Sequence, residues 1–428
     1  MSRSDETEVL VIGAGPTGIL TALVLAESGI GVKIVDKEYR TAAHSYACVL
    51  HPGTLQALSR LGLTEEICGL GQPIETMAFY QGELRRAEIS FGELSNFPYN
   101  YALVLPQSAF EDVLERQLAA RGVKVLWNHR LRDLEFKQGS ASAAIDKLVQ
   151  TAKGYIAADW DWTVQKRLET TADFVVGADG HNSMVRSRLG IDYESLGNAE
   201  QFAVFEFETD TDAGSEVRIA IDEKTTNVLW PLSGNRCRWS FQLLKSTDLG
   251  DFPAKDRERI RFTQAQADEP IRHAIERLAQ KRAPWFKRTV KEVQWSTRIQ
   301  FGRLLAKQFG KGRTWLVGDA GHQTGPVAAQ SMNVGLLEAV DLADRLKKVL
   351  RQGASQRLLE EYDHNRRAEW EQLLGKAGPV GGTVLANPWV EKYKTKLLPC
   401  LPASGQDVAQ LFDHIVGKDA ALAAPPHA

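Results

Sequence analysis

The chain has 428 residues, a length typical of two or three domains. Its 52 Lys and Arg residues nearly balance its 54 Asp and Glu residues, which removes the electrostatic argument for a nucleic-acid-binding protein. Apolar residues make up 43% of the sequence and charged residues 25%, which excludes a disordered chain.

Cysteines and the N-terminus restrict the class of protein further. The four cysteines are scattered, without a CxxC pair or a cluster of histidines: Cys48, Cys68, Cys237 and Cys400. This spacing argues against a disulfide scaffold and a zinc site, so no metal is predicted. There is no signal-peptide pattern and no run of about 18 apolar residues. We therefore expect a soluble, cytoplasmic protein without a membrane span.

The first segment has the pattern of a strand, a turn, a helix and a second strand. Residues 9–12 form a short apolar run, typical of a strand buried on both faces. Residues 19–28 are predicted as a helix that stops at Gly29, and residues 32–35 as a strand that ends in Asp36. Three glycines with GxGxxG spacing stand between the first strand and the helix: Gly13, Gly15 and Gly18.

A strand–helix–strand unit of this composition predicts a dinucleotide-binding site. The glycines permit a tight turn, close approach of the backbone to a pyrophosphate, and close packing of the helix on the strand. The helix N-terminus offers free N–H groups and a positive dipole end to the phosphates. Asp36 can accept a hydrogen bond from a ribose hydroxyl. This segment alone does not distinguish FAD from NAD.

The elements that follow change from mixed to antiparallel. Residues 131–172 alternate irregularly, which indicates short strands with turns. From about residue 200 to 243 the apolar residues follow a period of two, as in strands buried on one face. Residues 227–232 and 236–243 are predicted as a hairpin. Helices are predicted at 51–62, 109–120, 255–282 and 331–350, and a buried strand at 314–317.

Two later segments share one arrangement, a buried strand that ends in a Gly/Asp turn and opens into a helix. The first contains Asp179 and Gly180, followed by Arg186, and the second contains Gly318 and Asp319. Ligands of open α/β sheets bind at the carboxyl ends of the strands. An aspartate at such an end can hold a sugar or ribitol hydroxyl.

Together the three motifs resemble those of the group A flavoprotein monooxygenases, the p-hydroxybenzoate hydroxylase family. That family carries GxGxxG, DG and GD motifs in this order, and the resemblance covers roughly residues 7–350. It implies an α/β fold, in which a Rossmann-like FAD-binding domain holds an inserted, mostly antiparallel substrate domain (α+β). The expected ranges are 1–75, 100–190 and 296–370 for the FAD-binding domain, 76–99 and 191–295 for the substrate domain, and 371–428 for a C-terminal helical segment and tail.

By this resemblance the cofactor is FAD, and NADH or NADPH reduces it. Asp36 would hold the adenosine ribose, and Asp179 would serve both FAD and the nicotinamide cofactor. Asp319 would bind the ribitol chain, and the helix that opens after Gln330 would direct its N–H groups at the flavin pyrimidine. The implied cofactor residues are Gly13, Gly15, Gly18, Asp36, Lys37, Gln107, Asp179, Asp319, Gln330, Ser331, Met332 and Asn333.

Catalytic and substrate residues are also implied. Pro326 stands where the family keeps a proline beside the reactive edge of the flavin, and His322 is a candidate acid or base, although a structural role is the more common one for such a histidine. Trp230, Arg238 and Gln242 are candidate substrate residues. For Trp239 we favour a place in the core behind the sheet over one that faces the flavin; the core placement points Arg238 and Gln242 into the cleft.

The sequence departs from the family pattern at two places. The family often has GQGxN where residues 329–333 read Ala-Gln-Ser-Met-Asn, and it tends to have an arginine where Tyr46 stands. Residues 160–165 share part of the WxWxIP signature of flavin-dependent halogenases, but the proline is absent and the segment precedes the DG motif. Halogenation is therefore disfavoured.

The function implied is that of a monooxygenase. It would form a flavin C4a-hydroperoxide with O₂ and oxygenate, most simply hydroxylate, an aromatic or polycyclic small molecule. A same-fold flavin reductase or dehydrogenase and a non-catalytic flavin-binding scaffold stay open as alternatives. We expect a monomer or homodimer that binds no nucleic acid. The sequence does not identify the substrate or choose between NADH and NADPH.

Overall fold

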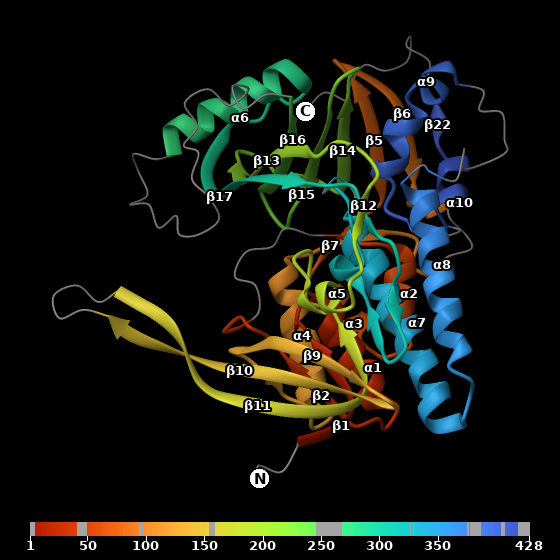
Figure 1. The fold of residues 1–428 in the computed structure, drawn as a ribbon. Helices are drawn as coiled ribbons and strands as arrows, with labels where there is room; N and C mark the ends of the chain where they lie inside the picture. The colour runs from red at the N-terminus through yellow and green to blue at the C-terminus, as the bar shows by residue number, and fades with distance from the viewer. Residues whose placement is uncertain are drawn as a thin grey trace.

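Strands from distant parts of the chain form one mainly parallel sheet (Figure 1). The structure is a computed structural model that describes residues 5–40, 49–93, 98–153, 159–244, 268–325, 327, 329–374, 376, 387–403 and 407–417. The strands are β1 (Asp5–Ile12), β2 (Val32–Val35), β8 (Val125–Leu126), β11 (Asp159–Gly177), β19 (Gly310–Lys311) and β20 (Thr314–Leu316). Their order is β19-β20-β11-β1-β2-β8, and β1 lies parallel to both β11 and β2. The sheet therefore brings the ends of all three motif strands to one edge.

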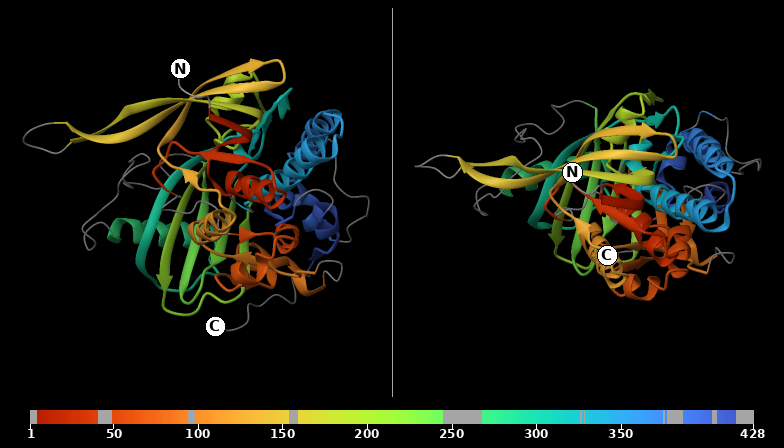
Figure 2. Two further views of the ribbon diagram at one scale, coloured as in Figure 1. Left: turned by 90° about the horizontal axis from the view of Figure 1, so that it is seen from below. Right: turned by 60° about the horizontal axis from the view of Figure 1, so that its bottom comes forward.

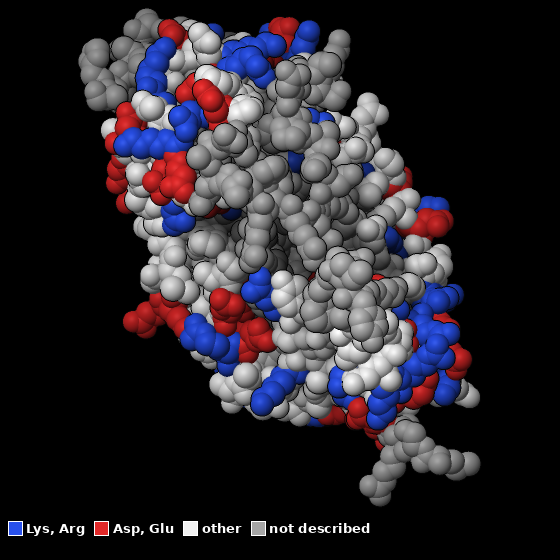
Figure 3. All heavy atoms as spheres, turned by 90° about the vertical axis from the view of Figure 1, so that its left-hand side faces the viewer, with Lys and Arg blue, Asp and Glu red and all other residues white. Residues whose placement is uncertain are grey.

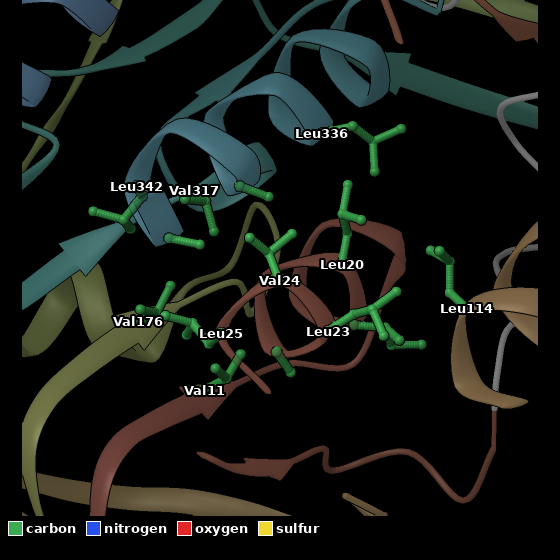
Figure 4. Close-up of a cluster of buried hydrophobic side chains, with 14 of the residues drawn as sticks. Val11, Leu20, Leu23, Val24, Leu25, Leu114, Val176, Val317, Leu336 and Leu342 are labelled. Carbon is green, nitrogen blue, oxygen red and sulfur yellow. The ribbon is translucent and has the colours of Figure 1, made fainter. Parts of the chain in front are cut away.

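Helix α1 (Pro16–Glu27) joins β1 to β2 and is buried along most of its length. Figure 4 shows its Leu20, Leu23 and Val24 between the sheet and the side chains of two further helices. These helices are α4 (Gln107–Ala120) and α7 (Gln330–Gln352), and both start slightly earlier than the sequence predicts. Because α1 packs on several sides, its sequence is apolar on more than one face.

A two-stranded ribbon leaves the parallel sheet. Strand β9 (His129–Lys137) pairs only with residues 140–147 of β10 (Ser140–Lys153), whereas β10 pairs with β11 out to residues 153 and 159. Figures 1 and 2 show the outer part of this ribbon projecting from the body. The prediction of short strands over residues 131–172 is wrong. The outer ribbon exposes side chains such as Trp162 and Val164, so no buried face imposes an alternating pattern on the sequence.

The second large sheet is almost entirely antiparallel. It contains β5 (Thr76–Gln81), β6 (Leu84–Ser90), β13 (Glu200–Thr209), β14 (Glu216–Ile221), β15 (Thr226–Pro231), β16 (Arg236–Leu243), β17 (Val290–Phe301) and β22 (Val416–Gly417). The strand order is β17-β13-β16-β15-β14-β5-β6-β22, and β14 is parallel to β5. The predicted hairpin is confirmed as β15 and β16.

Different elements cover the two faces of this sheet. Helix α6 (Asp268–Arg282) packs on the face that carries Trp239, and the rest of the helix predicted over residues 255–282 lies outside the described residues. The opposite face packs against α9 (Pro388–Leu397), α10 (Asp407–Asp413) and part of the first domain. The C-terminal segment thus belongs structurally to this sheet, which it extends with β22.

Smaller elements connect the two sheets. They are β3 (Val49–Leu50), α2 (Pro52–Ser59), α3 (Thr64–Cys68), β4 (Gln72–Ile74), β7 (Ala102–Val104), α5 (Met184–Arg188), β12 (Tyr193–Ser195), β18 (Leu304–Ala306), β21 (His322–Gln323) and α8 (Arg357–Leu373). Strands β3, β7 and β4 form one small sheet, and β12, β18 and β21 form another. The predicted α/β fold with an inserted antiparallel sheet is confirmed.

The near-neutral net charge of the chain is reflected in the mixture of charges on its surface. Figure 3 shows Lys and Arg side chains intermixed with Asp and Glu side chains on the face it views. Among the described residues, no helix combines the length and apolar character needed to cross a membrane.

Candidate functional site

Of the three glycines that follow β1, two have no room for a side chain and the third has room for one. A Cβ at Gly13, whose φ is 104°, would clash with the backbone of Ala178, and a Cβ at Gly18 would clash with the carbonyl of Gly13. Gly15 differs, because its φ of −71° and ψ of 179° suit any residue and a Cβ there would meet no atom within 4 Å. The chain itself thus gives no reason for glycine at this position, as expected of a loop that lets a ligand approach the backbone closely.

The acid after β2 is fixed beside this loop. The Asp36 carboxylate accepts hydrogen bonds from the backbone N–H groups of Ala14, at 2.5 Å, and Glu38, at 2.8 Å. Asp36 is half-buried, whereas the neighbouring Lys37 is exposed. The carboxylate is therefore held at the carboxyl end of β2, next to the N-terminus of α1, and the prediction that it holds an adenosine ribose stays a prediction.

The carboxylate of the DG motif caps its own helix. Asp179 accepts hydrogen bonds from Ser183 Oγ at 2.5 Å and from the N–H groups of Met184 and Val185 at 2.7 and 3.1 Å. Burial raises the pKa of Asp179, and these three donors oppose that shift. Within the described chain its side chain serves the turn before α5, and the prediction that it contacts the cofactors stays a prediction.

The DG turn is tied directly to the GD turn. Arg186 donates from Nη1 to the carbonyl of Ala320 at 2.9 Å, and its guanidinium lies 3.6 Å from the ring centre of Tyr193. The Tyr193 hydroxyl donates to the Asp319 carbonyl at 2.5 Å, and burial raises the pKa of Tyr193, which keeps this donor protonated. These contacts hold the backbone of Asp319 in place.

Two side chains at the start of α7 are occupied inside the protein. Asn333 accepts from His51 N–H and Thr54 Oγ1 and donates to the carbonyls of Val49 and Ala329, all within 2.8–2.9 Å. Gln330 Nε2 donates to the carbonyls of Leu398 and Leu401, at 3.4 and 3.3 Å. The first N–H groups of α7, at residues 330–332, lie at the positive end of the helix dipole, where an anion is favoured. Met332 packs against the core of the first domain.

His322 is completely buried, which bears on its predicted role in catalysis. Its Nε2 lies 3.0 Å from Glu338 Oε2, its Nδ1 lies 3.2 Å from Ser331 Oγ, and its ring stacks on Trp370 at 3.9 Å. This geometry suits a positioning role rather than proton transfer to a substrate. Pro326 and Tyr46 lie outside the described residues.

A cavity of about 250 Å³ lies between the two domains. Its walls come from β7 and the start of α4 on one side and from β13, β16 and β17 on the other. The lining residues are Leu70, Gln72, Val104, Leu105, Pro106, Ser108, Glu206, Leu232, Ser233, Arg236, Arg238, Gln294 and Trp295. Gln107 is flanked by two of them, and its Nε2 donates to Glu111 Oε1 at 2.7 Å.

One cross-strand row forms the polar part of the cavity wall. Trp295, Glu206, Arg238 and Trp230 lie opposite one another on β17, β13, β16 and β15. Arg238 Nη2 is 2.8 Å from Glu206 Oε2, and the Arg238 side chain is 5% exposed. Gln242 Oε1 accepts from the N–H of Thr226 at 2.8 Å and is absent from the lining. Of the three candidate substrate residues, Arg238 lines the cavity and Trp230 adjoins it in the same row.

Sequence reasoning missed Glu206 and Glu338. Glu206 stands opposite Arg238, and only the strand register reveals that pairing. Glu338 carried a signal, because Val334, Glu338 and Leu342 follow one helical stripe at intervals of four residues. A carboxylate at a core position of that stripe indicates a buried polar partner.

The chain is similar in sequence to proteins of one known family. Residues 6–377 match the model of the FAD binding domain family. The chain is 27% identical over 389 residues to 6-methylpretetramide 4-monooxygenase from Streptomyces rimosus, which covers 90% of this chain and 61% of that protein. It is 28% identical to an uncharacterized aromatic compound monooxygenase of Bacillus subtilis, covering 86% and 66%. The chain thus spans less than two thirds of the length of these two relatives.

Other relatives match over more of their length. Para-nitrophenol 4-monooxygenase from a Pseudomonas species is 26% identical, with 84% of this chain and 82% of that one covered. Among solved structures, p-nitrophenol 4-monooxygenase from Pseudomonas putida has a TM-score of 0.71 and 22% identity, covering 98% and 96%. Aklavinone-11 hydroxylase, solved with FAD and aklavinone, has a TM-score of 0.68 and 22% identity, covering 88% and 68%.

Proposed function

The chain belongs to the FAD-binding domain family, and from this premise we propose that it is an FAD-dependent monooxygenase that hydroxylates an aromatic small molecule with O₂ and NADH or NADPH. One observation carries the proposal: the three motifs, which are far apart in the sequence, meet around one glycine loop. Gly13 abuts Ala178 of the DG segment, and Gly318 of the GD turn abuts Thr17 of α1.

The residues around this loop fit FAD. Gly15 and the N-terminus of α1 would receive the pyrophosphate, and Asp36 would hold the adenosine ribose. Asp319 would hold the ribitol chain, and the positive end of the α7 dipole would face the negative charge of a reduced flavin. Gln107 would lie along the cofactor at the start of α4.

When bound, FAD would take a hydride from NADH or NADPH and pass one atom of O₂ to the aromatic ring. The chain orients the substrate and excludes water. The walls contributed by Leu105, Leu232 and Trp295 offer apolar surface to a ring, and the site lies between two domains that close it from both sides.

The cavity also supports a substrate class. An empty apolar cavity of about 150 Å³ binds benzene, so 250 Å³ suits a molecule with one or two rings. Two arginines, Arg236 and Arg238, face the single carboxylate of Glu206, which leaves a net positive wall. We therefore expect a small aromatic substrate that carries a phenolate or carboxylate oxygen.

The test is coupled turnover with a panel of small aromatics. The FAD-loaded protein is mixed with NADH or NADPH and with phenol, nitrophenols or hydroxybenzoates, while reductant loss, O₂ uptake and product mass are followed. We expect one compound to stimulate equal consumption of reductant and O₂ and to gain one oxygen atom. Reductant loss without an oxygenated product from any of them would indicate a reductase and contradict the proposal.

A further inference from the structure

Four polar side chains form a continuous line from the protein interior to the flavin side of the GD turn. Glu338 and His322 are fully buried, and Ser331 and Asp319 are partly exposed. Glu338 Oε2 is 3.0 Å from His322 Nε2, and His322 Nδ1 is 3.2 Å from Ser331 Oγ. Ser331 Oγ donates to Asp319 Oδ1 at 2.7 Å.

Several contacts fix the positions of Glu338 and His322 at the buried end of this line. Glu338 also accepts the N–H of Gly318 on Oε2 and the Trp370 Nε1–H on Oε1, both at 2.8 Å. Trp370 comes from α8 and stacks on the His322 ring, so one residue fixes both members of the pair. A buried carboxylate persists only when it is fully hydrogen-bonded, and these three donors meet that requirement.

The Ser331 hydroxyl joins the two halves of the line. It has one hydrogen, which it gives to the Asp319 carboxylate, a group that can only accept. The hydroxyl oxygen keeps lone pairs on the side of His322 Nδ1, and the other ring nitrogen, Nε2, faces Glu338 Oε2.

We propose that Ser331 is a positioning residue, which couples Asp319 to the buried Glu338–His322 pair and thereby orients the Asp319 carboxylate toward a ribitol hydroxyl of FAD. The proposal rests on the FAD role proposed above for Asp319. Oδ1 of Asp319 is engaged by Ser331, and no described residue donates to Oδ2, which leaves that oxygen for a ligand. Ser331 stands where the resembling family has a glycine, so this link comes from the chain's own sequence.

The test measures FAD affinity directly. FAD is titrated into apoprotein, with flavin fluorescence as the readout, for the wild type and for Ser331→Ala, Ser331→Thr and Asp319→Ala. We expect Ser331→Ala to weaken FAD binding about 5- to 20-fold, which is less than the loss of a direct hydrogen bond to a charged group because Ser331 acts on FAD only through Asp319, and we expect Ser331→Thr to restore the affinity. The melting temperature of the apoprotein should fall by only a few degrees, because Ser331→Ala removes one contact of the buried His322 ring and leaves the protein folded. Ser59→Ala, a change of a partly exposed helix serine that donates to the Gln56 carbonyl, serves as the matched control.

The double variant Asp319→Ala/Ser331→Ala decides whether the two residues act together. We expect it to bind FAD no more weakly than Asp319→Ala alone, because Ser331 acts through Asp319. Unchanged affinity in Ser331→Ala, or the same loss in the Asp319→Ala background, would overturn the proposal. The titration needs no turnover. A protein that shows the expected affinities and oxygenates no aromatic compound would therefore refute the proposed function alone.

Discussion

Gly15 is the N-cap of α1 and Gly18 lies in its first turn, yet the structure requires glycine at only one of these two positions. Gly18 packs against the carbonyl of Gly13 with no room for a side chain, whereas a Cβ at Gly15 meets open space. The two positions therefore separate a requirement of folding from a requirement of ligand binding.

This contrast gives a paired prediction. Gly15→Ala should leave the apoprotein folded, at a cost of about 1 kcal/mol or less for losing glycine at the helix N-cap, but should strongly weaken FAD binding. Gly18→Ala should destabilise the apoprotein itself, because backbone atoms have to move. Urea unfolding and FAD titration of both variants check this. Full FAD affinity in a folded Gly15→Ala protein would show that no ligand approaches that position.

Trp239 supports the second sheet rather than the cleft. It is fully buried, stacks on Phe241 at 4.6 Å between ring centres and contacts Trp285 and Phe286 under α6. The core placement favoured from the sequence is confirmed.

Trp239→Ala should therefore lower the free energy of unfolding by roughly 3–5 kcal/mol and leave the affinity for FAD unchanged. The control is Trp162→Ala on the exposed ribbon, expected to change stability by about 0.5 kcal/mol or less. Urea denaturation measures both. A stable Trp239→Ala protein that wastes NAD(P)H as hydrogen peroxide would contradict the core assignment.

The sequence was enough to locate the three motifs, but it did not predict the hydrogen-bond partners of the side chains in them. It placed Asn333 and Gln330 beside the cofactor, and both side chains turn out to bind segments far away in the chain. Asn333 and His51 are 282 positions apart, and Gln330 and Leu401 are 71 positions apart, so these contacts are tertiary and no local pattern encodes them.

At the scale of elements, the β10–β11 ribbon is the part of the fold with the least support. Beyond Lys147 no described strand pairs with the outer edge of β10, and β1 pairs only with residues 170–177 of β11. A two-stranded ribbon with both faces in water is only marginally stable by itself.

The outer ribbon should therefore be dispensable for the first domain. We expect a variant in which an Asn-Gly turn replaces residues 149–163 to fold with an unchanged melting temperature and unchanged FAD affinity. Thermal unfolding and FAD titration test this. A variant that no longer folds would mean that the ribbon stabilises the parallel sheet. The control is Val164→Thr in the full-length chain, which leaves the length of the ribbon unchanged.

Elements with a regular pattern of apolar residues were the predictable ones. The β15–β16 hairpin and helix α7 agree with the sequence within two residues, although β15 and β16 are buried on both faces and not on one face as the sequence predicts. The outer ribbon has no buried face that would impose such a pattern. The register that sets Glu206 opposite Arg238 was likewise beyond sequence reasoning, since it depends on which strands become neighbours.

At the scale of the whole molecule, the proposed FAD site gathers residues from both ends of the first domain, from Gly13 to Ser331. Binding should therefore stabilise the assembled fold. At a free concentration 100 times its dissociation constant, FAD should add about 2.7 kcal/mol to the free energy of unfolding.

The measurement is the melting temperature against the concentration of FAD, with FMN as the control ligand. FMN lacks the adenosine half, so it gains nothing from Asp36 and should raise the melting temperature less at equal concentration. Equal shifts with FMN and FAD would contradict the role of Asp36.

The distance in sequence between helices α1 and α7, which pack on each other, also affects the order in which the protein can fold during translation. Helix α1 leaves the ribosome early, but its packing partner α7 begins at Gln330, about 300 residues after α1 ends at Glu27. At typical rates of synthesis, α7 follows α1 by about 15–60 s, and during this time the apolar surface of α1 that faces α7 lacks its packing partner. Because the proposed FAD site includes residues of the GD turn and the start of α7, we expect FAD to bind only after this segment has been synthesised.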